Sequence, residues 1–304
     1  MMQSTRASRT QERSSVKDSA GCAHDILPLY DIDSPTVPER LRDNPYVLTG
    51  YRAQYDTTMC LRSFFTLHNE TLNVWTHAFG FVLFVLLSFL LFSSVVLSRE
   101  YVWHSIVYGS FSFACLLCMF CSTFYHLFMC HEKESLSLFA EALDYYGISV
   151  LIVGSYIPLL YIGFACKPYY QAIYMLCIIS LGVLSVVLLA LDNIRESKYR
   201  CLRLVVYIAL AASGVVPLLH LYALTPRNAE VMMTFKGVVL MFSLYSTGVF
   251  FYTTRIPESL FPGRFDLYLS SHQIWHVFVL SAACVHFFSC TALYQQWLVS
   301  RDIC

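Results

Sequence analysis

Seven long runs without a charged residue constrain this chain more than any other feature. A helix needs about 20 apolar residues to cross the hydrocarbon core of a bilayer, which is roughly 30 Å thick. Because backbone groups in lipid must be hydrogen-bonded within their own segment, such runs predict helices rather than strands. We therefore predict an all-α bundle of seven transmembrane helices. The runs cover residues 74–97, 102–129, 145–166, 168–191, 204–226, 237–254 and 267–299.

The composition agrees with a membrane protein and excludes several other classes. Hydrophobic residues make up 57% of the chain and charged residues only 13%, while the formal net charge is zero. A neutral chain has no overall field that would attract nucleic acid. Most of the 12 cysteines, such as Cys115, Cys118 and Cys121, fall inside apolar runs. This placement favours apolar packing between helices over a disulfide framework or a redox site.

The distribution of Lys and Arg in the short loops predicts the orientation. The positive-inside rule assigns the richer side to the cytosol, which places the amino terminus in the cytosol and the carboxyl terminus in the lumen or outside the cell. The glycosylation sequon Asn69-Glu70-Thr71 would then face the cytosol and stay unmodified. One side carries Arg62, Lys133, Arg195, Lys198, Arg200, Arg203, Arg255 and Arg264, and the other Arg99, Lys167, Arg227, Lys236 and Arg301.

The remaining segments divide the chain into four parts. Residues 1–33 are polar, contain no apolar signal-peptide core and predict a disordered cytosolic tail. Residues 34–72 mix aromatic residues with arginines, a pattern typical of an amphipathic juxtamembrane segment, although a solvated linker remains an alternative. Residues 73–299 form the transmembrane domain, and residues 300–304 form a short carboxyl-terminal tail.

Three histidines lie at the predicted cytosolic ends of two spans. His126 lies near the end of the second span, and His272 and His276 lie four residues apart at the start of the seventh. Residues four apart share one helix face, so both imidazoles can approach one point. Three imidazoles are a recognised ligand set for zinc, with the fourth position left open. Ser122 and Asp144, at the same depth, would support that site.

The other features of the spans have simpler interpretations. Histidines at a membrane boundary also hydrogen-bond to headgroups or to the backbone, so the spacing alone leaves the metal site open. Pro158 and Pro217 predict bends in the third and fifth spans, and His220 would then bond to carbonyls freed at Pro217. His77 lines the same cytosolic region without a partner by spacing. We interpret His104 and His286 as structural.

Several ordered motifs between residues 44 and 297 together resemble the progestin and adipoQ receptor family, within the adiponectin receptor and hemolysin III superfamily. The entry sequence Leu-Arg-Asp-Asn-Pro-Tyr at residues 41–46 is most similar to the Golgi subgroup linked to trapping of Raf kinase. The other motifs are Gly50-Tyr-Arg, the run from Leu67 to His77, Ser122-x3-His126, Ala142-Leu-Asp-Tyr145, Pro257-Glu, Phe261-Pro-Gly263 and Ser271-His-Gln-Ile-Trp-His276.

The resemblance implies a cofactor, a site and three candidate functions. It implies Zn2+ bound by His126, His272 and His276, with Asp144 and Ser122 near the zinc-bound water. The first function is a receptor or membrane anchor that retains Raf-type kinases at the Golgi through the cytosolic amino-terminal region and dampens mitogen signalling. The second is a ceramidase-like zinc hydrolase of lipid amides, with ceramide or a fatty acid in the bundle. The third is a plasma-membrane receptor for an adiponectin-like or steroid hormone.

Overall fold

The computed structural model describes residues 26–95, 102–195, 197–225 and 229–300. Seven membrane-crossing segments are built from α2, α3, α4, α5, α7 with α8, α9 and α10, which confirms the predicted seven-helix class for the described residues. No strand occurs among those residues, and two isolated bridges join Tyr30 to Tyr51 and Tyr55 to His131. The helices are α1 (Thr57–Ser63), α2 (Thr71–Val95), α3 (Val102–Phe128), α4 (Glu134–Gly163), α5 (Pro168–Leu189), α6 (Asp192–Arg195), α7 (Arg200–Ala212), α8 (Val215–Leu224), α9 (Ala229–Thr254) and α10 (Ser271–Ser300), with short 3-10 turns at Glu39–Leu41 and Ser197–Tyr199.

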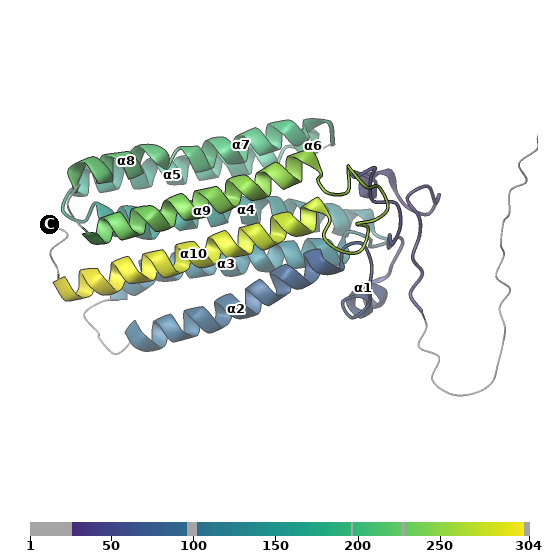
Figure 1. The fold of residues 1–304 in the computed structure, drawn as a ribbon, viewed down its shortest axis with the longest axis horizontal. Helices are drawn as coiled ribbons and strands as arrows, with labels where there is room; N and C mark the ends of the chain where they lie inside the picture. The colour runs from purple at the N-terminus through teal and green to yellow at the C-terminus, as the bar shows by residue number, and fades with distance from the viewer. Residues whose placement is uncertain (1–25, 96–101, 196, 226–228, 301–304) are drawn as a thin grey trace, which may run out of the picture.

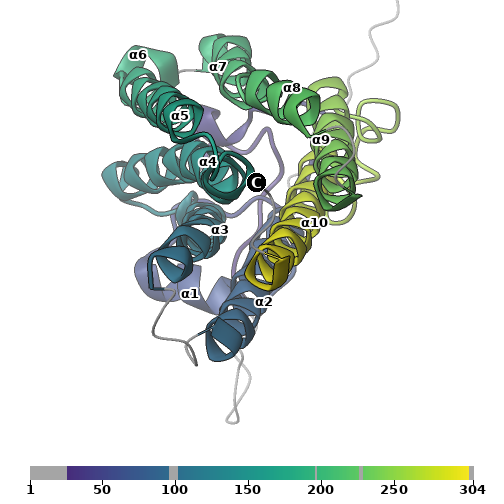
Figure 2. The same ribbon diagram turned by 90° about the vertical axis from the view of Figure 1, so that its left-hand side faces the viewer.

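The spans form a ring in which each helix packs against the next along the chain. Figure 2 shows α2, α3, α4 and α5 on one side and α7, α8, α9 and α10 on the other. The ring closes because α10 packs against α2 as well as α9. Thus α2 lies between α3 and α10, the two helices that carry the predicted ligands.

Close packing of small residues joins α3 to α4. A Cβ added at Gly154 would lie 2.4 Å from the Cβ of Ala114, and one at Gly147 would lie 3.1 Å from the Cα of Cys118. Cys115 and Cys118 are buried free thiols in the apolar core, as predicted for the cysteines inside spans. Cys166, in the connection from α4 to α5, is disulfide-bonded, so the exclusion of disulfides does not extend to this loop.

The two prolines affect their helices differently. Pro158 lies inside the continuous α4. Pro217 is the third residue of α8, where its missing N–H falls in the first turn, and the fifth span is divided just before it at Ser213 and Gly214. A Cβ at Gly214 would overlap the ring of Tyr156, so only glycine allows α4 and the break to approach this closely.

Residues 26–70 form a packed cap over the end of the bundle where α2 and α10 begin (Figure 1). Residues 26–33, assigned to the tail by their composition, include backbone hydrogen bonds from Tyr30 to Tyr51 and from Ile32 to Leu48. The predicted disorder of residues 1–25 lies outside the described residues. Side chains of the cap, α1 and the end of α3 share a second apolar core, which includes Val37, Leu41, Val47, Tyr51, Tyr55, Cys60, Leu127 and Phe128.

Some helices extend beyond their uncharged runs. The helix α4 begins at Glu134, whereas the uncharged run begins only at residue 145. Glu134, Glu141 and Asp144 lie in the first three turns of the helix, at the cap end, and interrupt the uncharged pattern there. Similarly, α9 continues through Lys236. A search for uncharged runs therefore misses helix turns that carry charge at the membrane boundary. In contrast, residues 267–270 precede α10 without helical structure.

Candidate metal centre

Three histidines from two helices converge at the cap end of the bundle. His126 lies in the last turn of α3, and His272 and His276 lie in the first two turns of α10. Their candidate ligand atoms all lie within 4.8 Å of one another. His126 and His276 are buried, and His272 is partly exposed.

The spacing of the imidazole nitrogens fits a tetrahedral ion. The Nε2 atoms of His126 and His272 are 3.3 Å apart. Two nitrogens that each bind zinc at about 2.05 Å with a tetrahedral angle would lie about 3.3 Å apart. The ring centre of His276 lies 4.7 Å from that of His126 and 4.9 Å from that of His272. The three residues can therefore hold a metal ion.

Glu70 sets the orientation of the first ligand. The Nδ1 atom of His126 lies 2.8 Å from Oε2 of Glu70, and the Nδ2 group of Asn73 donates to the same oxygen at 2.5 Å. Burial raises the pKa of Glu70, but the hydrogen bonds from His126 and Asn73 outweigh it and lower the pKa to about 2. An ionised Glu70 accepts the Nδ1 proton and leaves Nε2 of His126 free to bind an ion.

A second support comes from α2 and acts on His276. The ring of His77 stacks on that of His276 with centres 3.9 Å apart and planes 20° apart. The hydroxyl of Thr76 lies 3.4 Å from Nδ1 of His276. Because α2 lies between α3 and α10, one helix supports ligands from both neighbours.

Asp144 and Ser122 were predicted to support the histidines, and Asp144 interacts with both Ser122 and His126. The Ser122 hydroxyl is within hydrogen-bonding reach of the Asp144 carboxylate, and Asp144 is close enough to His126 for their charges to interact. Ser122 is buried, whereas Asp144 is partly exposed. Neither residue is among the candidate metal ligands of the described residues, so their catalytic role stays a prediction.

Two buried ionisable groups hold the ends of the ligand helices. Arg52 donates to the carbonyl of His126 at 2.6 Å and to that of Leu127 at 3.2 Å, which places a cation at the negative end of α3. At α10, the Ser271 amide donates to Glu258 at 2.7 Å, and the Ser271 hydroxyl bonds to the same carboxylate. Asn44 of the cap donates to Glu258 at 2.9 Å, so the cap is tied to the start of α10.

The histidine prediction held for the cluster but not for its surroundings. His77 was expected in the same region, but its stacking on His276 was not predicted. The sequence analysis missed Glu70, although an acidic residue directly before a membrane span was a usable signal. His220 was expected to bond to carbonyls freed at Pro217, but its Nδ1 instead lies 2.9 Å from the Tyr174 hydroxyl. His286 is buried and bonds to the carbonyl of Ser155 at 2.7 Å. The side chain of His104 lies outside the described residues.

Fold and site together define a multi-pass integral membrane protein of seven helices with three histidines near one end of the bundle that could hold a metal ion. A sequence profile of the haemolysin-III-related family matches residues 65–287. The chain belongs to this family, which here includes the adiponectin and progestin receptor-type proteins.

Named relatives are similar along most of the chain. It is 36% identical to the adiponectin receptor protein of Drosophila melanogaster over 255 residues, which is 83% of this chain but 56% of the fly protein. It is 35% identical to progestin and adipoQ receptor family member 3 of Homo sapiens over 79% of this chain and 78% of the human protein. Heptahelical transmembrane protein 1 of Arabidopsis thaliana is 35% identical over 86% of this chain and 80% of the plant protein.

Proposed function

We propose that this receptor-type membrane protein uses a zinc centre to hydrolyse an amide bond of a membrane lipid at the cytosolic side. The observation that carries the proposal is that three histidines able to hold an ion lie close to the partly exposed Asp144, whose carboxyl group interacts with His126. Bound by these histidines, zinc would supply Lewis-acid polarisation of the scissile carbonyl. Three neutral imidazoles with an open position are typical of catalytic zinc sites.

Asp144 has the properties of a general base in this arrangement. Its carboxylate accepts the proton of the attacking water and returns it to the leaving amine. Ser122 orients the carboxylate, and Glu70 keeps His126 in the tautomer that offers Nε2 to the ion. These roles fall to residues of the bundle and of the cap, which contributes Glu70.

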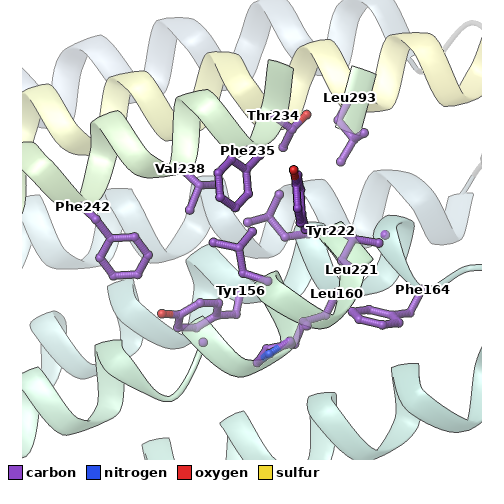
Figure 3. Close-up of a pocket in the computed structure, with 15 residues that line it drawn as sticks. Tyr156, Leu160, Phe164, Leu221, Tyr222, Thr234, Phe235, Val238, Phe242 and Leu293 are labelled. Atoms are coloured by element: carbon purple, nitrogen blue, oxygen red, sulfur yellow. The ribbon is translucent and has the colours of Figure 1, made fainter. Parts of the chain in front are cut away.

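A lipid is the substrate class that suits the rest of the interior. An apolar pocket between α4, α8, α9 and α10 is lined by Tyr156, Leu160, Phe164, Leu221 and Phe242 (Figure 3). Leu160 follows Asp144 by sixteen residues on α4, a rise of about 24 Å, which is comparable with an extended long-chain fatty acid. We propose that the acyl chain of ceramide, or of the fatty acid released from it, extends from the histidines toward this pocket.

Two features support an orientation with the metal centre toward the cytosol. The basic residues Lys198, Arg200 and Arg203 lie at the end that carries the histidines. Cys166, at the other end of α4, is disulfide-bonded, and disulfides persist mainly in oxidising compartments outside the cytosol.

The test combines metal analysis with turnover of purified protein. The wild type should carry one zinc ion per chain and hydrolyse ceramide, while His272→Ala with His276→Ala should lose the ion. Asp144→Asn should keep the ion and lose about 100-fold or more of the turnover. Glu134→Gln, an exposed carboxylate on the same helix, should retain both and serves as the matched control. Stoichiometric zinc without turnover of any amide lipid would refute the enzyme.

Anchoring of a signalling kinase at the Golgi is a second candidate. Two observations support it. The cap is an ordered surface on which Leu61 is 52% exposed and Phe65 is 83% exposed, and the chain is similar to a progestin and adipoQ receptor family member. Raf-type kinase should co-fractionate with Golgi membranes that contain the wild type. Leu61→Ser with Phe65→Ser should abolish this, and Asp144→Asn should not. Deletion of residues 1–71 is unsuitable because it removes Glu70 and Arg52 from the metal centre.

A plasma-membrane hormone receptor rests on family membership alone. The described connection between α4 and α5 spans only residues 164–167, which leaves little surface for a protein hormone at that end of the bundle.

A further inference from the structure

Two cysteines that are separated in the chain meet inside the cap. Cys60 lies on α1, and Cys130 follows the end of α3. Their sulfur atoms are 3.7 Å apart, and both residues are buried. A disulfide requires a sulfur separation of about 2.05 Å, which small side-chain rotations bring within reach from this distance.

The backbone around the pair keeps the two thiols in place. The amide of Tyr55 donates to the carbonyl of Cys130 at 3.1 Å, and the amide of Glu132 donates to the carbonyl of Tyr55 at 2.8 Å. The Cys60 amide donates to the carbonyl of Asp56 at 2.9 Å. The segment before α1 and the segment after α3 are thus hydrogen-bonded to each other beside the sulfurs.

The charges near the pair make the two thiols unequal. The hydrogen bond from Cys60 and the positive charge of Arg52 lower the pKa of Cys130 to about 7, against the opposing effect of burial. The same hydrogen bond and burial raise the pKa of Cys60. A thiolate is the reactive form of cysteine, so Cys130 is the nucleophile and Cys60 the resolving thiol.

A small pocket in the cap borders Cys130 but not Cys60. Tyr51, Arg52, Glu70, Met129 and Cys130 are among its lining residues, whereas Cys60 is not. The cysteines within the spans, such as Cys115 and Cys118, are instead packed in the apolar core of the bundle. This pocket is the side from which a small polar oxidant would approach Cys130.

We propose that Cys60 and Cys130 are a redox modification site that hydroperoxides convert into a reversible disulfide. In the first step the Cys130 thiolate attacks one oxygen of hydrogen peroxide, the O–O bond breaks, and a sulfenic acid and hydroxide form. The Cys60 thiol then attacks the sulfenic sulfur and the S–O bond breaks. The hydroxide leaving group takes the thiol proton to give water. Two thiols are oxidised and one peroxide is reduced to water.

The oxidised form ties α1 covalently to the end of α3. Arg52, which borders the pocket, also donates to the carbonyls of His126 and Leu127, so the modification lies next to the support of the metal centre. Reversible disulfides in the cytosol are usually redox sensors, which fits a site that a thiol reductant restores. The inference does not depend on lipid hydrolysis, because the chemistry involves neither His272 nor Asp144.

The test uses purified full-length protein in detergent, with the exposed Cys177 and Cys201 replaced by serine to remove competing thiols. The protein is treated with equimolar hydrogen peroxide, alkylated with N-ethylmaleimide, digested without reduction and examined by mass spectrometry. We expect a cross-linked peptide pair that contains Cys60 and Cys130, absent before peroxide and lost after dithiothreitol. Oxidation of other cysteines without this cross-link would overturn the proposal.

Two single variants separate the roles of the thiols. In Cys60→Ser the sulfenic acid at Cys130 should persist and be trapped by dimedone, because the resolving thiol is missing. In Cys130→Ser the rate of peroxide consumption should fall at least 10-fold relative to the parent protein, because the nucleophile is missing. A rate equal to that of the parent would contradict the assignment of Cys130 as the nucleophile. If either variant fails to fold, the cross-link in the parent protein still decides the proposal.

Discussion

Glu70 controls the tautomer and orientation of His126, and therefore how well this histidine can bind a metal ion. It accepts from His126 at 2.8 Å, and its loss would free the imidazole to adopt the other tautomer. We expect Glu70→Gln to lower metal affinity about 10- to 100-fold without unfolding the protein. Competition with a zinc chelator followed by elemental analysis measures this. Glu132→Gln, a carboxylate beyond the end of α3, should leave the affinity unchanged, and an equal loss in both variants would contradict the role of Glu70.

His68 makes folding sensitive to acid. Burial and the charge of Arg52 lower the pKa of His68 to about 3, below the usual 6.5 of an unfolded histidine. Between these values the unfolded chain binds one proton more than the folded chain, so stability is complete above pH 6.5 and falls as the pH decreases toward 3. The slope from this residue is at most about 1.4 kcal/mol per pH unit.

The variant His68→Gln should remove this part of the acid sensitivity. Thermal unfolding midpoints of both proteins are recorded from pH 7 to pH 4 with the same metal loading. The midpoint of the wild type should fall more steeply with decreasing pH than that of the variant, so the difference between the two should change with pH. A constant difference across the whole range would show that His68 does not titrate on unfolding.

Among the contacts between elements, we expect the contact between the cap and the end of α3 to contribute most to stability and to the position of His126. Arg52 is 2% exposed and donates to Ser63, Leu127 and His126. Replacement by methionine leaves buried carbonyls without a donor, and we expect a loss of roughly 2–4 kcal/mol in unfolding free energy together with weaker metal binding. Arg40→Met removes a more exposed arginine that also bonds to the end of α3 at Met129, and should cost about 1 kcal/mol. Similar losses for both would remove the special role of Arg52.

The elements also show where sequence patterns suffice and where they do not. Spans without charge were located correctly because apolar length is a local property that the bilayer imposes on each helix separately. The first turns of α4 were missed because Glu134, Glu141 and Asp144 interrupt the apolar pattern, yet lie at the membrane boundary next to the cap. A bend in the fifth span was expected at Pro217. The structure instead breaks the span between α7 and α8 at Gly214, where the backbone packs against Tyr156 of α4.

For the whole molecule, orientation in the membrane is the main prediction. Asn69 is buried and its carbonyl accepts from Gln273, so an unmodified sequon would follow from burial as well as from a cytosolic location. Thiol labelling is more informative. In sealed microsomes an impermeant maleimide should label the exposed Cys201 at the start of α7 without detergent. A cysteine introduced as Tyr169→Cys, at the other end of the bundle, should be labelled only after detergent is added. The reverse pattern would invert the topology.

The sequence by itself determined the seven spans and the grouping of His126, His272 and His276 at one end. Both follow from local rules: apolar length sets the spans, and helical spacing places residues four apart on one face. Only the tertiary structure decided that α2 lies between α3 and α10, that Glu70 and His77 support the ligands, and that Cys60 meets Cys130. These contacts join residues far apart in the chain, and they depend on how whole helices and the cap pack, which no local pattern specifies.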